Sequence, residues 1–313
     1  MKSEKKTLRK RIRIIITVLL IFTVVSMVAT KFIYDAIFTR YDAPAEPVPQ
    51  QLAQMVAQRQ TQEYPCGENM LTGYLYRSEA GQAGLVVLTP GYRAGADDYL
   101  WQIKDLLEGG WSVFAFDATG SCSSEGESAV GFAQILNDLD ATLKYVEKCD
   151  RFGYNELVLF GHSRGGYAAC CALGYDYEIS AVISVSGVNS AMEGVMGSAT
   201  EYVGPLAYGN YGFLWLYQTC LFGNETANMC ADEEISQSDT PVLIVHGTMD
   251  EQVPMEQYSI ISHRDEITSD AVEYYLCNEP AQNGHTDLLF DADGTANDAL
   301  MEKIHGFLSE HTD

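Results

Sequence analysis

Residues 156–166 read ELVLFGHSRGG, a short apolar run that leads directly into the pattern G-x-S-x-G. The apolar run predicts a buried strand at Leu157–Phe160, and the residues beyond the pattern predict a helix at Tyr167–Leu173. A serine at such a junction, between glycines that leave room for a sharp turn, is typical of a nucleophile elbow. We therefore interpret Ser163 as a nucleophile at the start of a helix, with an ordinary helix N-cap as the alternative.

Apolar runs alternate with helical patterns on both sides of this stretch, from about residue 65 onward. This alternation predicts an α/β domain whose main strands are preceded by one antiparallel strand. The expected strands lie at 70–77, 85–89, 111–116, 157–160, 181–185, 242–245 and 272–277. The expected helices lie at 97–107, 132–147, 167–173, 255–262 and 296–308.

A nucleophilic serine needs a base, and the base needs an acid that orients it. Asp250 follows the strand at 242–245, and His285 lies in the sequence NGHTD after the strand at 272–277. Because the carboxyl ends of parallel strands meet at one edge of a sheet, we expect both side chains near Ser163. We predict His285 as the base and Asp250 as the acid.

Other residues compete for these two positions. Glu251 adjoins Asp250 but is expected to point elsewhere, and Asp287 is placed to cap a following helix. The other histidines do not follow the last strand, and they are His162, His246, His263, His305 and His311.

The oxyanion of a tetrahedral intermediate needs hydrogen-bond donors. The backbone N–H of Arg164, directly after the serine, is the first expected donor. The second is expected in the loop after an early strand, where Gly91 lets the backbone turn close to the site. We therefore predict the N–H of Tyr92 as the second donor. The side chain of Arg164 is expected to be a surface group or a supporting group of the site.

Five stretches resemble the α/β-hydrolase superfamily, and they are TPGYRAG (89–95), FDATGSCSSEG (116–126), GHSRGG (161–166), PVLIVHGTMDEQVP (241–254) and NGHTD (283–287). Their joint order over about residues 65–310 is far more specific than any one of them. The closer resemblance is to dienelactone-hydrolase, prolyl-oligopeptidase-like and serine-aminopeptidase-like esterases. It implies an α/β-hydrolase fold with a mostly parallel central sheet, helices on both faces and an inserted lid.

The chain departs from the family's pattern at two places. Ser121 and Cys122 stand where relatives usually have Gly-His-Gly. This departure is expected to alter the wall near the site. Tyr92 stands where many members have a small residue, which leaves the role of its side chain open. Asp117 is expected to order its own loop through hydrogen bonds rather than take part in catalysis.

About 50 residues, 187–240, separate the strands at 181–185 and 242–245, too many for a simple connection. The segment is rich in aromatic residues. We expect a lid that lines an acyl or hydrophobic pocket, with plain packing as the alternative. The cysteines raise a further question, because Cys220 and Cys230 could form a disulfide in this segment. The adjacent pair 170–171 is expected to be buried as thiols.

The N-terminus carries the opposite charge to the rest of the chain. Residues 1–13 hold seven cations and one acid, whereas the 313 residues together have a net charge of −24. As a helix, the apolar residues 14–33 approach the ~30 Å hydrocarbon thickness of a bilayer. We predict a single-pass cell-membrane anchor with a cytoplasmic N-terminus and an extracytoplasmic remainder. A cleaved signal peptide and secretion are the alternative.

Prolines in YDAPAEPVPQQ (41–51) favour an extended backbone. They predict a juxtamembrane linker over 34–63, with a short helix within 50–60. The remaining residues, 64–313, form the expected hydrolase domain.

Composition limits the partners. Hydrophobic residues make up 47% of the chain, enough to bury a large core. A pI near 4.4 argues against nucleic acid, because phosphate binding needs clustered cations. No spacing typical of a metal site and no phosphate- or dinucleotide-binding glycine pattern is found, so neither a metal nor a cofactor is predicted.

Together these patterns predict a carboxylesterase-like serine hydrolase on the outer face of the membrane. Its substrate would be a small or medium ester or a peptide-like compound, cleaved through an acyl-enzyme. A serine aminopeptidase and an acyltransferase or lipase are the enzymatic alternatives. A non-catalytic surface binding module is the alternative of a different class.

Overall fold

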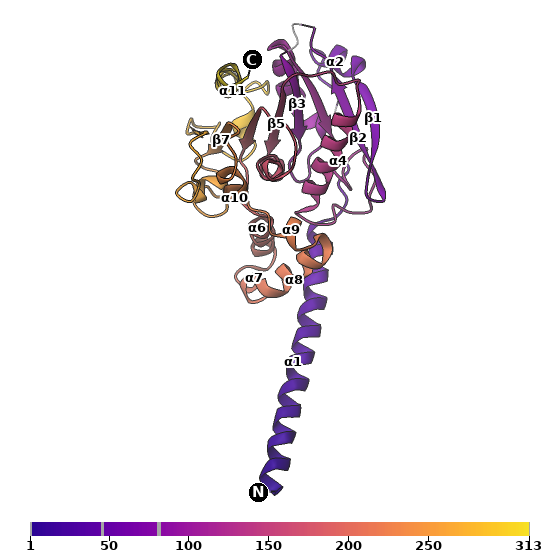
Figure 1. Cartoon of the computed structure of the whole chain (residues 1–313), viewed down its shortest axis with the longest axis vertical. Coiled ribbons are helices and arrows are strands. Elements are labelled where there is room, and N and C mark those ends of the chain that lie inside the picture. The colour runs from indigo at the N-terminus through magenta and orange to yellow at the C-terminus, as the bar shows by residue number, and fades with distance from the viewer. Residues whose placement is uncertain (1, 45–46, 80–82, 313) are drawn as a thin grey trace.

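A single sheet of eight strands organises the computed structural model, which describes residues 2–44, 47–79 and 83–312 (Figure 1). The strands are β1 (Gln60–Cys66), β2 (Asn69–Tyr76), β3 (Gly84–Thr89), β4 (Trp111–Phe116), β5 (Leu157–His162), β6 (Ala181–Val185), β7 (Val242–Gly247) and β8 (Val272–Cys277). Their order across the sheet is β1-β2-β4-β3-β5-β6-β7-β8. β1 and β2 are antiparallel, β2 is antiparallel to β4, and every later pairing is parallel.

All seven expected strands are confirmed to within two residues, but β1 was not expected. Its sequence, QTQEYPC, is mostly polar because β1 lies at the edge of the sheet and buries only alternate side chains. The central strands are buried on both faces and therefore read as continuous apolar runs, which are easier to recognise.

Helices cover both faces of the sheet. The helices that pack on it are α3 (Leu100–Glu108), α4 (Gln134–Lys148), α5 (Arg164–Cys171) and α11 (Asp298–His311). α4 and α5 share one apolar core with one set of strand residues, such as Val87 and Leu159. α3 and α11 share the other core with the alternate residues, such as Val86 and Val158. This two-sided burial makes the expected α/β architecture a three-layer structure.

The prediction of a helix at 255–262 is wrong. The structure has only the short 3₁₀ turn Ile260–His263 there. The backbone before the turn is bonded elsewhere, because the N–H of Asn189 donates to the carbonyl of Tyr258 at 2.8 Å. Pairing with the segment after β6 thus replaces the hydrogen bonds of a helix.

The insertion between β6 and β7 is helical. We call its first three helices the cap helices, which are α6 (Ala191–Val203), α7 (Leu206–Gly209) and α8 (Tyr211–Phe222). Two further helices, α9 (Asn224–Ala227) and α10 (Ala231–Ser236), return the chain to the sheet. Figure 1 shows the cap helices where the sheet-containing body meets the long helix α1 (Lys2–Ile37).

The helix α1 has the length and composition of a membrane anchor or of a signal sequence over Lys6–Ile37. Its C-terminal end is part of the folded body, since Tyr34, Ile37 and Phe38 are almost fully buried. The first residues of the predicted linker, 34–38, therefore include side chains that are buried in the core.

The segment after α1 is also fastened to the body. The guanidinium of Arg40 donates to the carbonyls of Cys122, Ser124 and Gly126 at 2.6–3.0 Å. The short helix expected within 50–60 is found as α2 (Ala53–Gln58). This part of the chain lies against the body, whereas residues 45–46 of the proline-rich stretch fall outside the described residues.

All eight cysteines fall within the described residues, and all are free thiols. The disulfide considered between Cys220 and Cys230 is therefore not formed. Cys170 and Cys171 are buried thiols, as expected, and burial raises the pKa of Cys170 to about 12.

Substitution of Gly165 should test the close approach of α5 to the end of β3. A Cβ atom at this position would lie 2.1 Å from the carbonyl oxygen of Thr89, so backbone would have to move. We expect Gly165→Ala to lower the free energy of unfolding by about 2–4 kcal/mol in denaturant titrations. Gly306→Ala in α11 is the matched control, because nothing lies within 4 Å of its Cβ. The control should gain up to about 1 kcal/mol. Equal effects of the two changes would contradict the steric argument.

Candidate active site

Ser163 sits on a sharp turn between β5 and α5. Its backbone has φ 55° and ψ −120°, a conformation that a residue with a side chain rarely adopts. Glycines make the turn possible, because a Cβ on Gly161 would lie 2.1 Å from the carbonyl oxygen of Gly165. The N–H of Ser163 donates to the carbonyl of Val185 on β6 at 2.8 Å, which fixes the turn to the sheet. These constraints hold Ser163 out beyond the carboxyl end of the strand.

Ser163 opens into a cavity of about 1220 Å³. The predicted residues Tyr92 and His285 line the same cavity, from the loops after β3 and β8. Its far walls come from α6 and from Ile37 at the end of α1. Three loops at one edge of the sheet thus meet in a single chamber, with one wall supplied by the insertion.

Asp250 and His285 form a buried pair. His285 Nδ1 lies 2.7 Å from Asp250 Oδ2, and both residues are less than 10% exposed. The other carboxylate oxygen, Oδ1, accepts the backbone N–H groups of Gln252 and Val253 at 2.9 and 2.8 Å. Burial alone would raise the pKa of Asp250, but the bonds from His246 and His285 outweigh it and hold that pKa well below its usual range. Asp250 is therefore ionised and can orient the His285 ring.

His246 contacts Asp250 and helps to hold its carboxylate, a role that the sequence did not predict. Its Nε2 lies 2.9 Å from the carbonyl oxygen of Val253 and 3.3 Å from Asp250 Oδ2. His246 is fully buried at the end of β7. The available signal was a histidine four residues before the acid, at the end of an otherwise apolar strand.

His162 positions the backbone of His285. Its Nε2 lies 3.0 Å from the His285 carbonyl oxygen, and its Nδ1 lies 3.0 Å from the hydroxyl of Tyr99. That hydroxyl accepts the N–H of Gly91 at 3.0 Å and so has its own proton free to give to Nδ1. Burial lowers the pKa of His162 to about 3, so the ring is neutral and donates from Nε2. A second donor, Ser186 Oγ, reaches the same carbonyl at 3.2 Å.

The loop that carries the predicted oxyanion donor lies against the serine. A Cβ built on Gly91 would be 3.4 Å from Ser163 Cβ, so the backbone at 91–92 passes close to it. Arg164 is the first residue of α5, where a backbone N–H has no partner within the helix. The backbone segments that carry both predicted donors therefore lie beside Ser163, and the donor roles of Tyr92 and Arg164 stay a prediction. The described contacts include no hydrogen bond between the hydroxyl of Ser163 and the ring of His285.

The side chain of Tyr92, left open by the sequence, joins the oxyanion loop to α1. Its hydroxyl donates to the carbonyl of Ile37. Its ring packs edge-on against Phe38, with 5.7 Å between ring centroids. The end of α1 therefore braces the loop beside Ser163.

The side chain of Arg164 is not a surface group, so of the two expected roles only that of a supporting group is left. It is 1% exposed, and none of its three guanidinium nitrogens has a hydrogen-bond partner among the described residues. The guanidinium carbon lies 5.5 Å from the centre of the Tyr92 ring, a cation–π arrangement. Burial lowers the pKa of this guanidinium.

Among the described contacts, neither residue weighed as an alternative acid bonds to the ring of His285, which faces Asp250. Glu251 lines the cavity but is exposed. Asp287 is also exposed, and the prediction that it caps a helix is wrong, because it is the first residue of a 3₁₀ turn whose N-cap position is Thr286. Asp117 orders its loop as expected, because it accepts the N–H groups of Ala96 and Ser123 at 2.9 and 3.1 Å. Ser121, a departure from the family pattern, is not among the described residues that line the cavity.

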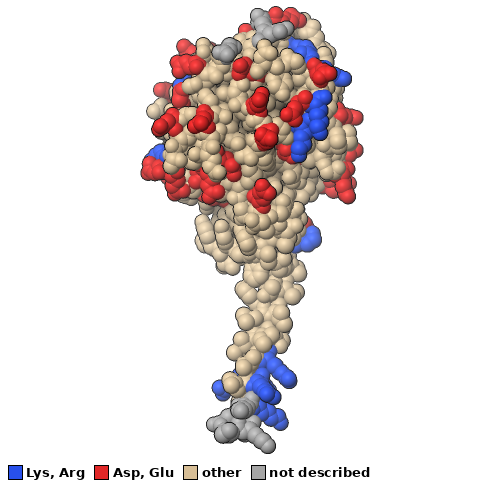
Figure 2. Space-filling view, viewed as in Figure 1, with Lys and Arg blue, Asp and Glu red and all other residues tan. Residues whose placement is uncertain are grey.

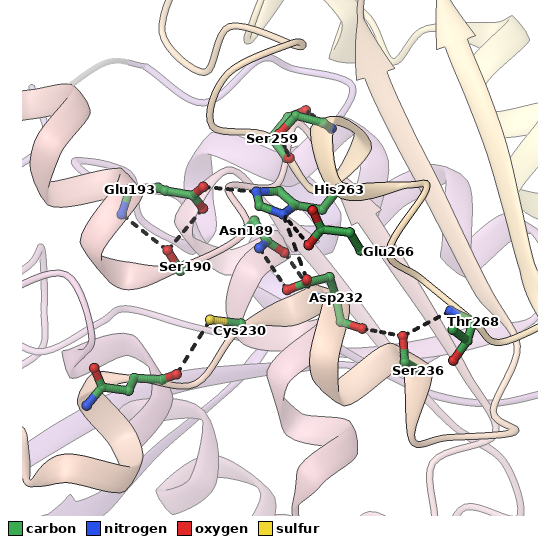
Figure 3. A network of polar contacts seen from close by, with 12 residues as sticks. Asn189, Ser190, Glu193, Cys230, Asp232, Ser236, Ser259, His263, Glu266 and Thr268 are labelled. Atoms are coloured by element: carbon green, nitrogen blue, oxygen red, sulfur yellow. Dashed lines mark hydrogen bonds and ion pairs between the residues drawn. The ribbon is translucent and has the colours of Figure 1, made fainter.

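Figure 3 shows a polar cluster around His263. His263 Nε2 lies 2.9 Å from Glu193, and Nδ1 lies 3.3 Å from Glu266 and 3.8 Å from Asp232. Glu193 itself lines the cavity from the first turn of α6, where Ser190 caps the helix. The cluster therefore ties the first cap helix to the turn at 260–263.

Among the residues that the structure describes, two groups of side chains have the spacing to hold a metal ion. They are Asp232, His263 and Glu266, and Glu273, Glu310 and His311. In the first group both ring nitrogens of His263 already face carboxylates. Asp232 already accepts from Asn189 at 2.8 Å. Neither group lines the cavity, and the expectation that no metal is needed stays a prediction.

The His263 cluster makes stability depend on pH. Burial lowers the pKa of His263, but the bonds and charges of Glu193, Glu266 and Asp232 together outweigh it and raise the pKa above 6.5. A raised pKa stabilises the fold below the unfolded pKa of about 6.5, and the effect is lost as pH rises through the folded pKa.

We expect the wild type to exceed His263→Gln by about 0.5 kcal/mol in the free energy of unfolding near pH 6. The value is small because the pair is partly exposed. Urea titrations should show this difference shrinking by pH 9. A difference that grows with pH would contradict the assignment.

The comparisons with known proteins match this architecture. An esterase from Pyrococcus furiosus superposes with a TM-score of 0.65 at 18% identity, covering 87% of this chain and 99% of that one. Est1E from Butyrivibrio proteoclasticus, solved with ferulic acid bound, superposes with a TM-score of 0.62 at 19% identity, covering 80% and 98%. An esterase from Exiguobacterium antarcticum superposes with a TM-score of 0.55 at 16% identity, covering 80% and 100%. The chain has the α/β-hydrolase fold.

The sequence is similar to one family in particular. A family model described as serine aminopeptidase, S33, matches residues 80–208. This range contains the oxyanion loop, the elbow and the first cap helix, and it ends before Asp250 and His285. A comparison with curated proteins finds no match.

Proposed function

We propose that the protein is a serine hydrolase that cleaves carboxylic esters, held at a membrane by α1. The observation that carries this proposal is the buried bond of 2.7 Å between Asp250 and His285, beside a cavity that also contains the strained Ser163. The esterases among the solved structures of the same fold support an ester substrate.

The reaction begins with attack of Ser163 Oγ on the ester carbonyl. His285 accepts the hydroxyl proton at Nε2, since its Nδ1 faces Asp250. The carboxylate keeps that tautomer and stabilises the imidazolium. The N–H groups of Tyr92 and Arg164 hold the oxyanion, and the loss of one such donor costs about 3–4 kcal/mol of barrier.

The imidazolium then protonates the leaving alcohol, and an acyl-enzyme remains on Ser163. Water attacks the acyl carbon while His285 accepts its proton. The bond from the acyl carbon to Ser163 Oγ then breaks, the imidazolium returns the proton to Oγ, and the acid is released. The supporting bonds from His246 to Asp250 and from His162 to the His285 backbone keep the base in place through both steps.

The proposed placement has α1 in the cell membrane and the catalytic domain outside. Seven cations in residues 1–13 favour a cytoplasmic N-terminus. No residue between Arg13 and Lys31 is charged. Secretion after signal cleavage is the competing arrangement.

A second candidate is an aminopeptidase, which one feature of the cavity favours. Four carboxylates line it, which are Asp98, Glu193, Glu201 and Glu251. The exposed Glu201 and Glu251 could bind the ammonium group of a peptide N-terminus. The serine aminopeptidase family model agrees with this reading over residues 80–208.

Labelling with a fluorophosphonate tests the nucleophile. The probe phosphonylates an activated serine, so the wild type should be labelled and Ser163→Ala should not. The measurement is gel fluorescence of the purified full-length chain. Ser309→Ala is a matched control, because Ser309 is an exposed serine of α11 outside the cavity lining, and this variant should remain labelled. Equal labelling of the wild type and Ser163→Ala would reject the assignment.

Two substrate series separate the ester and peptide hypotheses. Nitrophenyl esters of increasing acyl length and aminoacyl anilides should be compared by kcat/KM. We expect the esters to be preferred, and Glu251→Gln to leave their hydrolysis within about twofold because no cation needs to be bound. Faster cleavage of the anilides, lost in Glu251→Gln, would instead establish the aminopeptidase.

A further inference from the structure

We propose that the cap helices lie within the lipid leaflet on the catalytic side, and that an amphipathic ester reaches Ser163 from that leaflet. The proposal rests on the proposed function, because it gives the membrane-held hydrolase its substrate class and its route of access.

One stripe of α1 packs along the cap helices. Ser26, Thr30 and Tyr34 are buried at successive turns, whereas residues on the other sides of α1 are exposed. The ring of Phe22 adds a contact one turn earlier, packing edge-on against Phe213 of α8 with 5.9 Å between centroids. α1 and α8 are therefore partners over several turns.

This contact fixes the depth of α8. Phe22 lies nine residues from Arg13 and nine from Lys31, the cations that bound the apolar stretch. Along a helix each cation is about 14 Å away, so Phe22 lies near the middle of a ~30 Å hydrocarbon layer. A membrane crossed by α1 between these cations must therefore contain the end of α8 that carries Phe213.

The outer surface of the cap helices suits lipid. Eight large apolar side chains are exposed there, and they are Tyr202, Val203, Leu206, Tyr208, Tyr211, Trp215, Leu216 and Leu221. Only five others are exposed among the described residues outside α1. Residues 202–224 contain no charged residue. Figure 2 shows the result as a nearly uncharged zone between the acidic body and the basic tip. Tyrosine and tryptophan are enriched where proteins meet membrane interfaces.

Polar side chains within this zone are paired inside the protein. Asn210 donates to the hydroxyl of Thr30 at 2.7 Å. Gln218 accepts from the hydroxyl of Tyr34 at 2.9 Å and donates to the carbonyl of Ala227 at 3.0 Å. Lipid offers no hydrogen bonds, so such internal pairing is what a membrane environment requires.

The cavity reaches this surface. Ile37 of α1 and Tyr202 of α6 line it together with Ser163. Tyr202 is also more than half exposed on the apolar surface, so one side chain borders both the chamber and the zone. An ester with a long acyl chain in the leaflet would find its carbonyl near the serine without crossing water. The leaflet is thus the favoured source of substrate.

Tryptophan quenching tests the depth directly. The full chain contains three tryptophans and none lies in α1, so the anchor itself gives no signal. In vesicles of phosphatidylcholine with brominated acyl chains, Trp215 should be quenched, and Trp215→Phe should lose the quenched component. Equal fractional quenching of the two proteins would overturn the proposal.

A pair of leucine variants tests access. Leu206 is 81% exposed on α7, and Leu276 is 43% exposed on the edge strand β8. Leu206→Glu should lower hydrolysis of a long-chain ester embedded in vesicles by about tenfold, because a charge enters lipid at a cost. It should change hydrolysis of a dissolved short-chain ester by less than about twofold.

The matched variant Leu276→Glu should leave both rates within about twofold. Equal rates on the embedded ester for the two variants would overturn the proposal. If the serine-hydrolase assignment itself were wrong, the wild type would cleave neither ester while Trp215 quenching persisted. If only the membrane placement were wrong, hydrolysis of the dissolved ester would persist without quenching.

Discussion

The backbone of Ser163 is the constraint on which the rest of the site depends. A residue with a side chain is held at φ 55° where β5 crosses to α5, and glycines on both sides let backbone atoms approach. Because β5 lies between β3 and β6, the loops after those strands must pass beside the serine. The sheet order therefore sets which segments can supply an oxyanion donor and a supporting backbone. The cost of the strained turn is met by the buried packing around it.

Hydrogen bonds between buried polar groups hold the other site residues, Asp250 and His285, in place. The carboxylate of Asp250 is held by two backbone N–H groups and two histidines, and so stays charged in a buried place. His162 is neutral and serves as a spacer between Tyr99 and the carbonyl of His285. Three histidines thus have different roles in one site: His285 is the predicted base, His246 supports Asp250, and His162 positions the backbone of His285. Burial and hydrogen-bond partners determine each role.

Much of this arrangement could be predicted from residues alone. Apolar runs located the central strands, and the rule that ligand-binding loops gather at carboxyl ends brought Asp250 and His285 together. The edge strand β1 escaped because half of it faces water and it contains Pro65. His246 and His162 escaped because their partners are backbone carbonyls, which no sequence pattern displays. The seating of Phe38 in the core depends on contacts between segments far apart in the chain.

The docking of α1 also decides how this protein would search for substrate. Phe38 is buried in the core, and Arg40 is hydrogen-bonded to the loop at 122–126. The segment directly after α1 is therefore held against the catalytic domain, which limits rotation of the domain relative to α1. The cavity of the domain keeps one orientation to the helix axis. With α1 in a membrane, as proposed, encounters with a lipid-borne ester would follow lateral diffusion in two dimensions. The surface density of an ester, rather than its bulk molarity, would then set the rate at which the site is filled.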